Sequence, residues 1–222
     1  MQRASIVCAA LLCLGSAVAA PFDRVTIDAP GELIIMQGET ESVRIEAEAA
    51  VRPRLRVQVD SGTLVIGTTG SLQTQRPIRF HVTLRTLRWL QTDGSAQVRI
   101  GALRTPALSL QLRGSSSAHL TELHTARLDA ALDGASTLQI DRGMVQRQSL
   151  ALDDAATYDA PGLHSDEAQV AVHGSSHARL HAARRLDAQA RGSGRIAYTG
   201  TPRITQRLAD AAELAAASTD KP

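Results

Sequence analysis

Three aspartates, Asp133, Asp153 and Asp154, are the side chains of this sequence best suited to chemistry. Carboxylates gathered on one face can coordinate a cation. They can also act as an acid/base pair in which repulsion between like charges raises one pKa, as cleavage of an acidic polysaccharide requires. Asp133 and Asp153 lie 20 residues apart, so a fold that repeats with that period would place them side by side.

An internal repeat supplies this period. A Gly-Ser or Gly-Ala pair recurs at one phase, in Asp93-Gly94-Ser95, Arg113-Gly114-Ser115, Asp133-Gly134-Ala135 and His173-Gly174-Ser175. A fixed period of this length is typical of a solenoid, in which each unit buries its apolar face by stacking on its neighbours. The repeats run over 87–106, 107–126, 127–146, 147–166, 167–185 and 186–205, and the last interval is two residues short.

Apolar residues alternate with polar ones on both sides of the recurring pair. Four residues before the glycine stand Leu90, Leu110, Ala130, Leu150, Val170 and Ala188. After it stand Val98, Ala118, Leu138, Tyr158, Ala178 and Ile196. Alternation at a spacing of two indicates β-strands, because successive side chains point to opposite faces. The sequence therefore predicts an all-β solenoid of about six 20-residue coils.

The recurring glycines are expected to form the corners of the coils, where a β-carbon would obstruct the backbone. Asp154 takes the glycine position of the fourth coil, and Asp is among the few other residues that tolerate the left-handed region. Small residues follow each corner, because stacked corners leave little lateral room. The predicted structural turn positions are Gly94, Gly114, Gly134, Gly174, Gly192, Gly194, Gly200 and Pro202.

The segments before and after the repeats have different sequence patterns. Six β segments occupy 22–27, 31–36, 41–47, 54–59, 62–67 and 78–84, with a polar loop at 68–77. They form either irregular first coils or a cap that protects an open sheet edge. The Ala-rich segment 206–222 is expected to be a C-terminal tail, either a short helix or frayed.

The N-terminus predicts export. Residues 1–19 combine a positive start, an apolar core and a small-residue cleavage site after Ala19, as secretory signal peptides do. Both cysteines, Cys8 and Cys13, lie in this segment, so no disulfide is expected in the mature chain. No later segment is long and apolar enough to cross a membrane. We expect a periplasmic protein, with the cell surface or the extracellular space as the alternative.

Composition argues against a nucleic-acid partner. The formal net charge is +2, which gives no basic surface for phosphates. Aromatic residues make up 2 % of the chain, which removes the stacking platforms that single-strand and sugar-binding surfaces use.

The outward positions give little support for catalysis. The residues before the corner glycines form a ladder of mixed charge, namely Asp93, Arg113, Asp133, Asp153, His173 and Arg191. A second outward ladder consists of Arg99, His119, Gln139, Asp159, Arg179 and Ala197. A solvated charge ladder is the favoured interpretation of Asp133, Asp153 and Asp154, and a cation or ligand group is the alternative. His173, His177 and His181 have helical metal-ligand spacing, but the intervening turn breaks that geometry. We therefore expect no catalytic residues, no cofactor and no metal.

The closing segment RGSGRIAYTGTP at 191–202 resembles the putative auto-transporter adhesin family with the head GIN domain. Gly192, Ser193, Gly194, Tyr198 and Gly200 are its most specific residues, and Pro202 ends it. The resemblance extends from about 22 to 204, so a head GIN-like domain is expected over 20–205. It implies a right-handed β-helix-like fold in exported bacterial proteins with an adhesive role. The sequence departs from the family at the Asp153-Asp154 corner and in its tail.

Three classes of function remain open. The first is a non-enzymatic binding module of the envelope or cell surface, with an unidentified protein or glycan ligand. The second is a periplasmic structural or assembly scaffold, and the third is a polysaccharide-active β-helix enzyme. The oligomeric state is open as well.

Overall fold

The computed structural model describes residues 17–18, 21–70, 72, 74 and 76–217. The expected signal peptide therefore lies outside the described residues, except for β1 (Ala17–Val18), which pairs antiparallel with β4. None of the helical segments in the described part of the chain has the length and apolar character that crossing a membrane requires.

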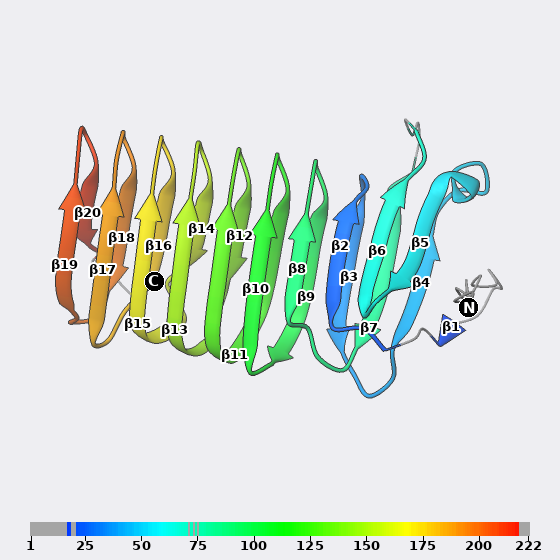
Figure 1. The fold of residues 1–222 in the computed structure, drawn as a ribbon, viewed down its shortest axis with the longest axis horizontal. Helices are drawn as coiled ribbons and strands as arrows, with labels where there is room; N and C mark the ends of the chain where they lie inside the picture. Colours follow the sequence, from blue (N-terminus) through cyan, green and yellow to red (C-terminus); the bar gives the residue numbers. More distant parts are fainter. Residues whose placement is uncertain (1–16, 19–20, 71, 73, 75, 218–222) are drawn as a thin grey trace, which may run out of the picture.

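Each coil has a front strand, a tight corner, a back strand and a wider return edge (Figure 1). The front sheet contains β8 (Trp89–Thr92), β10 (Ala107–Leu112), β13 (Gly143–Leu152), β15 (Leu163–Val172), β17 (Arg185–Ala190) and β19 (Arg203–Leu208). The back sheet contains β9 (Gln97–Arg104), β12 (Thr137–Ile140), β14 (Thr157–Ala160), β16 (His177–His181), β18 (Arg195–Thr199) and β20 (Glu213–Ala216). One long strand, β11 (Ser117–Leu132), curves around the wide edge and belongs to both sheets.

The register confirms the predicted repeat. Coils pair in parallel at an interval of 20 residues, as in Ala107 with Arg127 and Ser117 with Thr137. The interval shortens to 18 where Glu167 pairs with Arg185, as the short last repeat requires. The chain rises along the front, returns along the back and advances toward the C-terminal end, which makes the solenoid right-handed (Figure 1).

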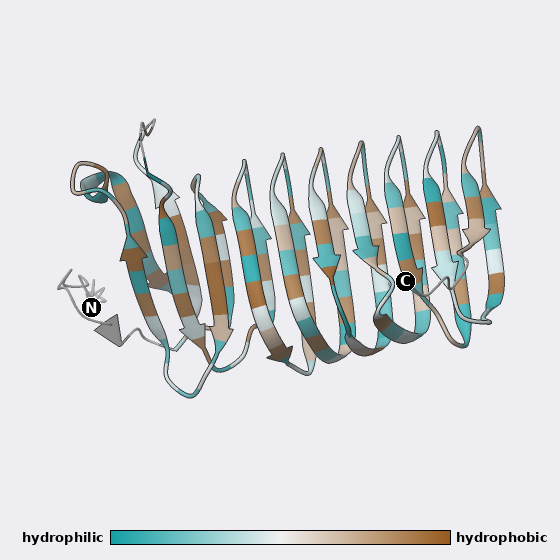
Figure 2. Cartoon of the chain, turned by 180° about the vertical axis from the view of Figure 1, so that it is seen from behind, coloured by the Kyte–Doolittle hydropathy of each residue, from teal (hydrophilic) through white to brown (hydrophobic). Residues whose placement is uncertain are grey.

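The core lies between the two sheets and consists mainly of aliphatic side chains. Both predicted inward sets are buried, from Leu90 and Val98 in the first repeat to Ala188 and Ile196 in the last. Apolar colour alternates with polar colour along the strands (Figure 2). Burial of this continuous column of side chains is the main stabilising term, and no single coil could supply it alone.

The N-terminal segment supplies both more coils and a cap. β2 (Arg24–Asp28) and β3 (Glu32–Gln37) form a coil that stacks on β8 and β9. β6 (Thr63–Thr68) and β7 (Arg79–Leu84) form the next coil outward. β4 (Ser42–Glu46) and β5 (Leu55–Asp60), joined through the short 3-10 helix η1 (Arg52–Arg54), then pair antiparallel on β7 and β6. The antiparallel pair covers the N-terminal end of the stack.

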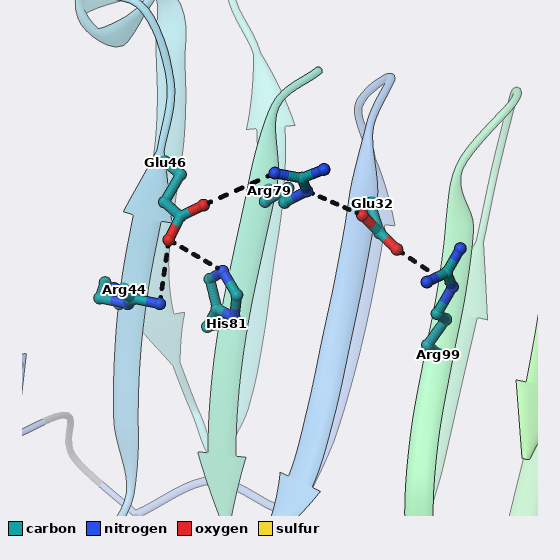
Figure 3. Close-up of polar contacts among 6 residues, drawn as sticks. All are labelled: Glu32, Arg44, Glu46, Arg79, His81 and Arg99. Carbon is teal, nitrogen blue, oxygen red and sulfur yellow. Dashed lines mark hydrogen bonds and ion pairs between the residues drawn. The ribbon is translucent and has the colours of Figure 1, made fainter. Parts of the chain in front are cut away.

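A chain of ion pairs ties this cap to the solenoid (Figure 3). Glu46 Oε1 lies 2.9 Å from Arg44 Nη2 and 3.3 Å from His81 Nε2. Arg79 bridges Glu46 and Glu32, with its Nε donating to Glu32 Oε2 at 3.0 Å. Arg99 Nε lies 3.1 Å from Glu32 Oε1, an ion pair without an aligned hydrogen bond. The Glu32 side chain is only 14 % exposed, so it joins three strands from a largely desolvated position.

The solenoid continues past residue 205, which corrects the expectation of a tail at 206–222. β19 pairs with β17 and β20 pairs with β18 in the same 18-residue register. Asp210 occupies the corner position with a φ of 61°, where Gly192 stands one coil earlier. The small alanines that suggested a helix or a frayed end fit a stacked strand, because a helix would forfeit pairing with the previous coil. Residues 218–222 lie outside the described part.

Stacked corners explain the recurring glycines. Gly94, Gly114, Gly134, Gly174 and Gly192 have φ between 68° and 78°. The corner carbonyl of each coil accepts the next coil's N–H, as when Ala135 N donates to Gly114 O at 2.8 Å. A β-carbon on Gly134 would lie 2.6 Å from that same carbonyl oxygen. The glycine therefore relieves both left-handed strain and a backbone clash.

The other predicted turn positions have different structural roles. Asp154 keeps the left-handed corner with a φ of 64°, and the bond from Ala155 N to Gly134 O is 3.0 Å, the longest of its row. Gly194 lies in the buried slot that Ser116 and Ser176 fill in earlier coils, and a β-carbon there would meet Val172. Gly200 has a φ of 97° on the wide edge, two residues before Pro202.

Replacing Gly134 by alanine should destabilise the chain more than the same change at Gly62. Both residues have left-handed φ, but a β-carbon on Gly62 meets nothing within 4 Å. Strain alone predicts a loss of about 1 kcal/mol for Gly62→Ala, and the added clash about 2–4 kcal/mol for Gly134→Ala. Urea unfolding followed by circular dichroism measures both. Equal losses would contradict the proposed role of corner stacking.

Candidate functional site

The structure brings two of the three predicted aspartates to adjacent corners. Asp133 and Asp153 are exposed at the same position of successive coils, and Asp154 is exposed at the corner itself. Asp153 Oδ1 contacts His173 Nδ1 of the following coil at 2.9 Å. Within the described ranges, no three His, Cys, Asp or Glu side chains converge as metal ligands. A cation or ligand role for the three aspartates stays a prediction.

The outward ladders lie in the predicted positions, and many of their charges form ion pairs. Arg99, His119, Gln139, Asp159, Arg179 and Ala197 are register neighbours on the back sheet. Arg113 lies 3.9 Å from Asp93, and Arg179 lies 3.5 Å from Asp159. Such exposed pairs contribute about 0–1 kcal/mol each and make the sheets flat, nearly neutral surfaces.

The three histidines with helical spacing are separated by the fold. His173 lies at a corner, His177 begins β16 and His181 ends that strand at the wide edge. The predicted turn between the first two is confirmed by the left-handed Gly174. Of the three, only His181 reaches the groove described next.

A groove of about 440 Å³ runs along the wide edge, opposite the tight corners. Its outward ladder consists of Arg104, His124, Met144 and His164, one residue from each of four consecutive coils. Met144 is 64 % exposed, an unusual degree for a thioether on a polar surface. The partly covered His181 closes one end of the groove. Because the four side chains of this ladder come from stacked coils, the groove runs across the coils instead of lying within one.

Hydrogen bonds orient the histidine of the second coil. His124 Nε2 lies 2.8 Å from Glu122 Oε1, and Arg142 holds the other Glu122 oxygen at 2.8 Å. These two partners lower the pKa of the Glu122 carboxyl, so it stays ionised. The arrangement fixes the His124 ring through its Nε2 and turns Nδ1 into the nitrogen that a ligand can reach.

The end of the groove that His181 closes contains two histidines in edge-to-face contact. The ring centres of His164 and His181 are 4.6 Å apart, with 77° between the ring planes. Ser165 N donates to His181 Nδ1 at 3.3 Å. Burial lowers the pKa of His181, and the neighbouring His164 lowers it further. His181 is therefore favoured in its neutral form.

A buried polar network supports the groove floor from inside the core. Tyr158 Oη donates to Gln148 Oε1 at 2.8 Å, and Gln148 Nε2 donates to Ser165 Oγ at 2.8 Å. Gln148 Nε2 also reaches the His181 carbonyl at 3.1 Å, and Ser165 Oγ donates to the same oxygen. Gln148 and Tyr158 are both fully buried, and burial raises the pKa of the Tyr158 phenol. The network rigidifies the edge where the coil shortens.

The sequence prediction missed this groove because the inward and outward sets that it compared lie within five residues of the corner glycine. The signal was present, since His124, Met144 and His164 recur at 20 residues, ten after Gly114, Gly134 and Asp154. Their types differ from coil to coil, so no single chemical motif marked them. Gln148 was also detectable, as the one polar residue in an inward column that reads Leu128 and Ala168 on either side.

The architecture defines a class: a right-handed β-solenoid with one covered end and glycine corners. The chain belongs to the family described as putative auto-transporter adhesin, head GIN domain, which matches residues 21–202. No protein with a curated description is significantly similar to the chain.

Solved structures share the fold. A putative adhesin from Bacteroides fragilis is 20 % identical with a TM-score of 0.81, over 91 % of this chain and 94 % of its own. A putative adhesin from Parabacteroides merdae is 17 % identical with a TM-score of 0.73, over 92 % and 95 %. A putative lipid binding protein from Parabacteroides distasonis is 18 % identical with a TM-score of 0.69, over 90 % and 94 %. At these identities the similarity shows the fold alone.

Replacing Tyr158 by phenylalanine should cost about 1–3 kcal/mol of unfolding free energy, because Gln148 Oε1 is then buried without a donor. The double variant Tyr158→Phe with Gln148→Leu should recover part of that loss, since leucine already fills the neighbouring position 128. Denaturant unfolding of both variants measures the difference. A double variant no more stable than Tyr158→Phe would contradict the coupling.

Stability should fall on acidification through the range where His181 binds a proton in the unfolded chain but not in the folded one. The unfolded pKa is about 6.5, and the folded value is lower. The stabilising contribution is therefore fully present above about pH 6.5 and is lost as pH falls through the folded pKa. The free energy of unfolding, measured in urea at about pH 7.5 and about pH 5, should decrease less for His181→Gln than for the wild type. His177→Gln, on an exposed position, should keep the wild-type decrease, and an unchanged decrease in His181→Gln would refute the assignment.

Proposed function

We propose that this chain is an exported, non-enzymatic binding module whose ligand binds in the wide-edge groove. The ligand is a protein or a glycan of the bacterial envelope or cell surface. One observation carries the proposal: Arg104, His124, Met144 and His164 come from four consecutive coils and line one groove. A site built by stacking suits an extended ligand that contacts several repeats at once.

The chemistry of the groove supports this class of ligand. Arg104 supplies a permanent positive charge, and His124 and His164 supply ring nitrogens that can donate or accept hydrogen bonds. The exposed thioether of Met144 supplies an adaptable apolar contact. This mixture of apolar and convergent polar groups is typical of binding sites and suits a sugar ring or a peptide.

The electrostatics of the groove favour binding over catalysis. A carboxyl that donates a proton at neutral pH needs a raised pKa. Glu122, the carboxylate that holds His124, has the opposite shift, because His124 and Arg142 stabilise its ionised form. Its role is to position the imidazole, which supports a non-enzymatic assignment.

Export and location are part of the proposal and are tested first. Antibody against the chain should stain permeabilised cells of the producing bacterium, as expected for the periplasm, and staining of intact cells would add an adhesive role at the surface. Failure to fractionate with the envelope at all would contradict export. Signal only after permeabilisation would exclude adhesion to external partners and point to a periplasmic partner.

Binding should depend on several coils together. On an array of acidic and neutral envelope glycans, the triple variant Arg104→Ala, His124→Ala and His164→Ala should lose about tenfold or more in affinity, and each single variant about threefold or less. The matched control is Asp133→Asn with Asp153→Asn and Asp154→Asn at the opposite corners, which should bind as the wild type does. Loss of binding in the control but not in the groove variant would indicate that the ligand binds at the aspartates.

A further inference from the structure

The two ends of the solenoid stop in different ways. At the N-terminal end, the antiparallel strands β4 and β5 cover β7 and β6. At the other end, within the part of the chain that the structure describes, β19 pairs only with β17 and β20 only with β18. β19 and β20 stand at the end of the stack (Figure 1), so the backbone N–H and C=O groups on their outer edges have no described strand beside them. Such edges are templates for pairing with another strand.

The last layer of core side chains is open as well. Ile204 and Leu208 are 41 % and 40 % exposed, whereas Leu186 and Ala190, their equivalents one coil earlier, are fully buried. Leu214 of β20 packs on the core and is half-buried. Exposed apolar side chains beside unpaired backbone are typical of a surface that a partner covers.

We infer that this end binds the same end of a second copy of the chain, forming a two-fold symmetric dimer. The register of β19 is self-complementary. Antiparallel pairing centred on Gln206 places Ile204 opposite Leu208 of the second copy, and all inward residues stay on the inward face. Gln206 then faces its own equivalent, and each amide can donate to the other's oxygen.

The same axis serves the second strand. Pairing of β20 centred on Ala215 places Leu214 opposite Ala216 of the second copy, again on the core side. Gln206 lies two residues before the corner end of β19 at Leu208, and Ala215 lies two residues after the corner end of β20 at Glu213. The two centres are therefore level across the coil, so one rotation pairs both sheets.

The charges tolerate this arrangement. In the register centred on Gln206, Arg203 faces Ala209, next to Asp210 of the second copy, and Arg207 faces Thr205. The arginines do not meet each other, and each Arg203 approaches an opposite charge. Because a two-fold interface uses the same end of both copies, the assembly closes at two copies instead of growing into a fibre.

Sedimentation and a cysteine cross-link test the dimer. The full chain should sediment with twice its own mass at micromolar concentration, and Leu208→Lys should sediment as a monomer with an unchanged β circular dichroism spectrum. Met36→Lys, at an exposed apolar residue of β3, should stay dimeric. A wild type that stays monomeric would overturn the inference.

The cross-link keeps the test decisive if Leu208→Lys does not fold. The background variant has Cys8 and Cys13 changed to serine. In it, Gln206→Cys lies opposite the same residue of the second copy, across the two-fold axis. Such a pair has a Cα separation in the range of about 4.4–6.8 Å that a disulfide spans. Oxidised glutathione accepts the two electrons and two protons as the S–S bond forms, and a covalent dimer should result. Gln189→Cys, exposed on β17 one coil away, should stay monomeric. Equal cross-linking of the two variants, or none at Gln206→Cys, would contradict the proposed register.

Discussion

The close stacking of corner on corner is the constraint on which the rest of the structure depends. Each corner carbonyl accepts the N–H of the following coil, at 2.8 Å for Ser115 to Gly94 and 2.7 Å for Ser175 to Asp154. This contact leaves no room for a β-carbon on most corner residues, as the 2.6 Å approach at Gly134 shows. Because one edge of every coil is fixed in this way, the strands on both faces inherit a single register.

The opposite edge has more freedom, and the function proposed above is located there. β11 curves around it without interruption, whereas later coils turn through shorter segments. The shift from a 20-residue to an 18-residue interval falls beside His181 and is accommodated by the bonds among Gln148, Ser165 and that histidine. A rigid corner and a variable edge allow the fold to change its groove without changing its core.

Sequence was sufficient to predict the repeat, its strands up to residue 205 and its corners up to Gly192, because period and glycine placement report directly on stacking. It also placed the outward ladders correctly, as the Arg99 to His119 register shows. It did not predict that β2 and β3 insert between later strands, since spatial order across a sheet leaves no local pattern. Asp210 was missed because aspartate at a left-handed corner looks like an ordinary polar residue, although Asp154 offered a precedent. The groove was not predicted because its side chains differ in type from coil to coil and form a site only when the coils stack.

Hydrogen exchange of individual amides, followed by NMR, tests the corner stacking most directly. Amides at surface turns ordinarily exchange fast, whereas these corner amides donate to the preceding coil. The account predicts strong protection of Ser115, Ala135, Ser175 and Ser193, comparable with the flanking strands, and rapid exchange of Thr74 in the loop after β6. Corner amides that exchange as fast as Thr74 would contradict a solenoid held in register at its corners.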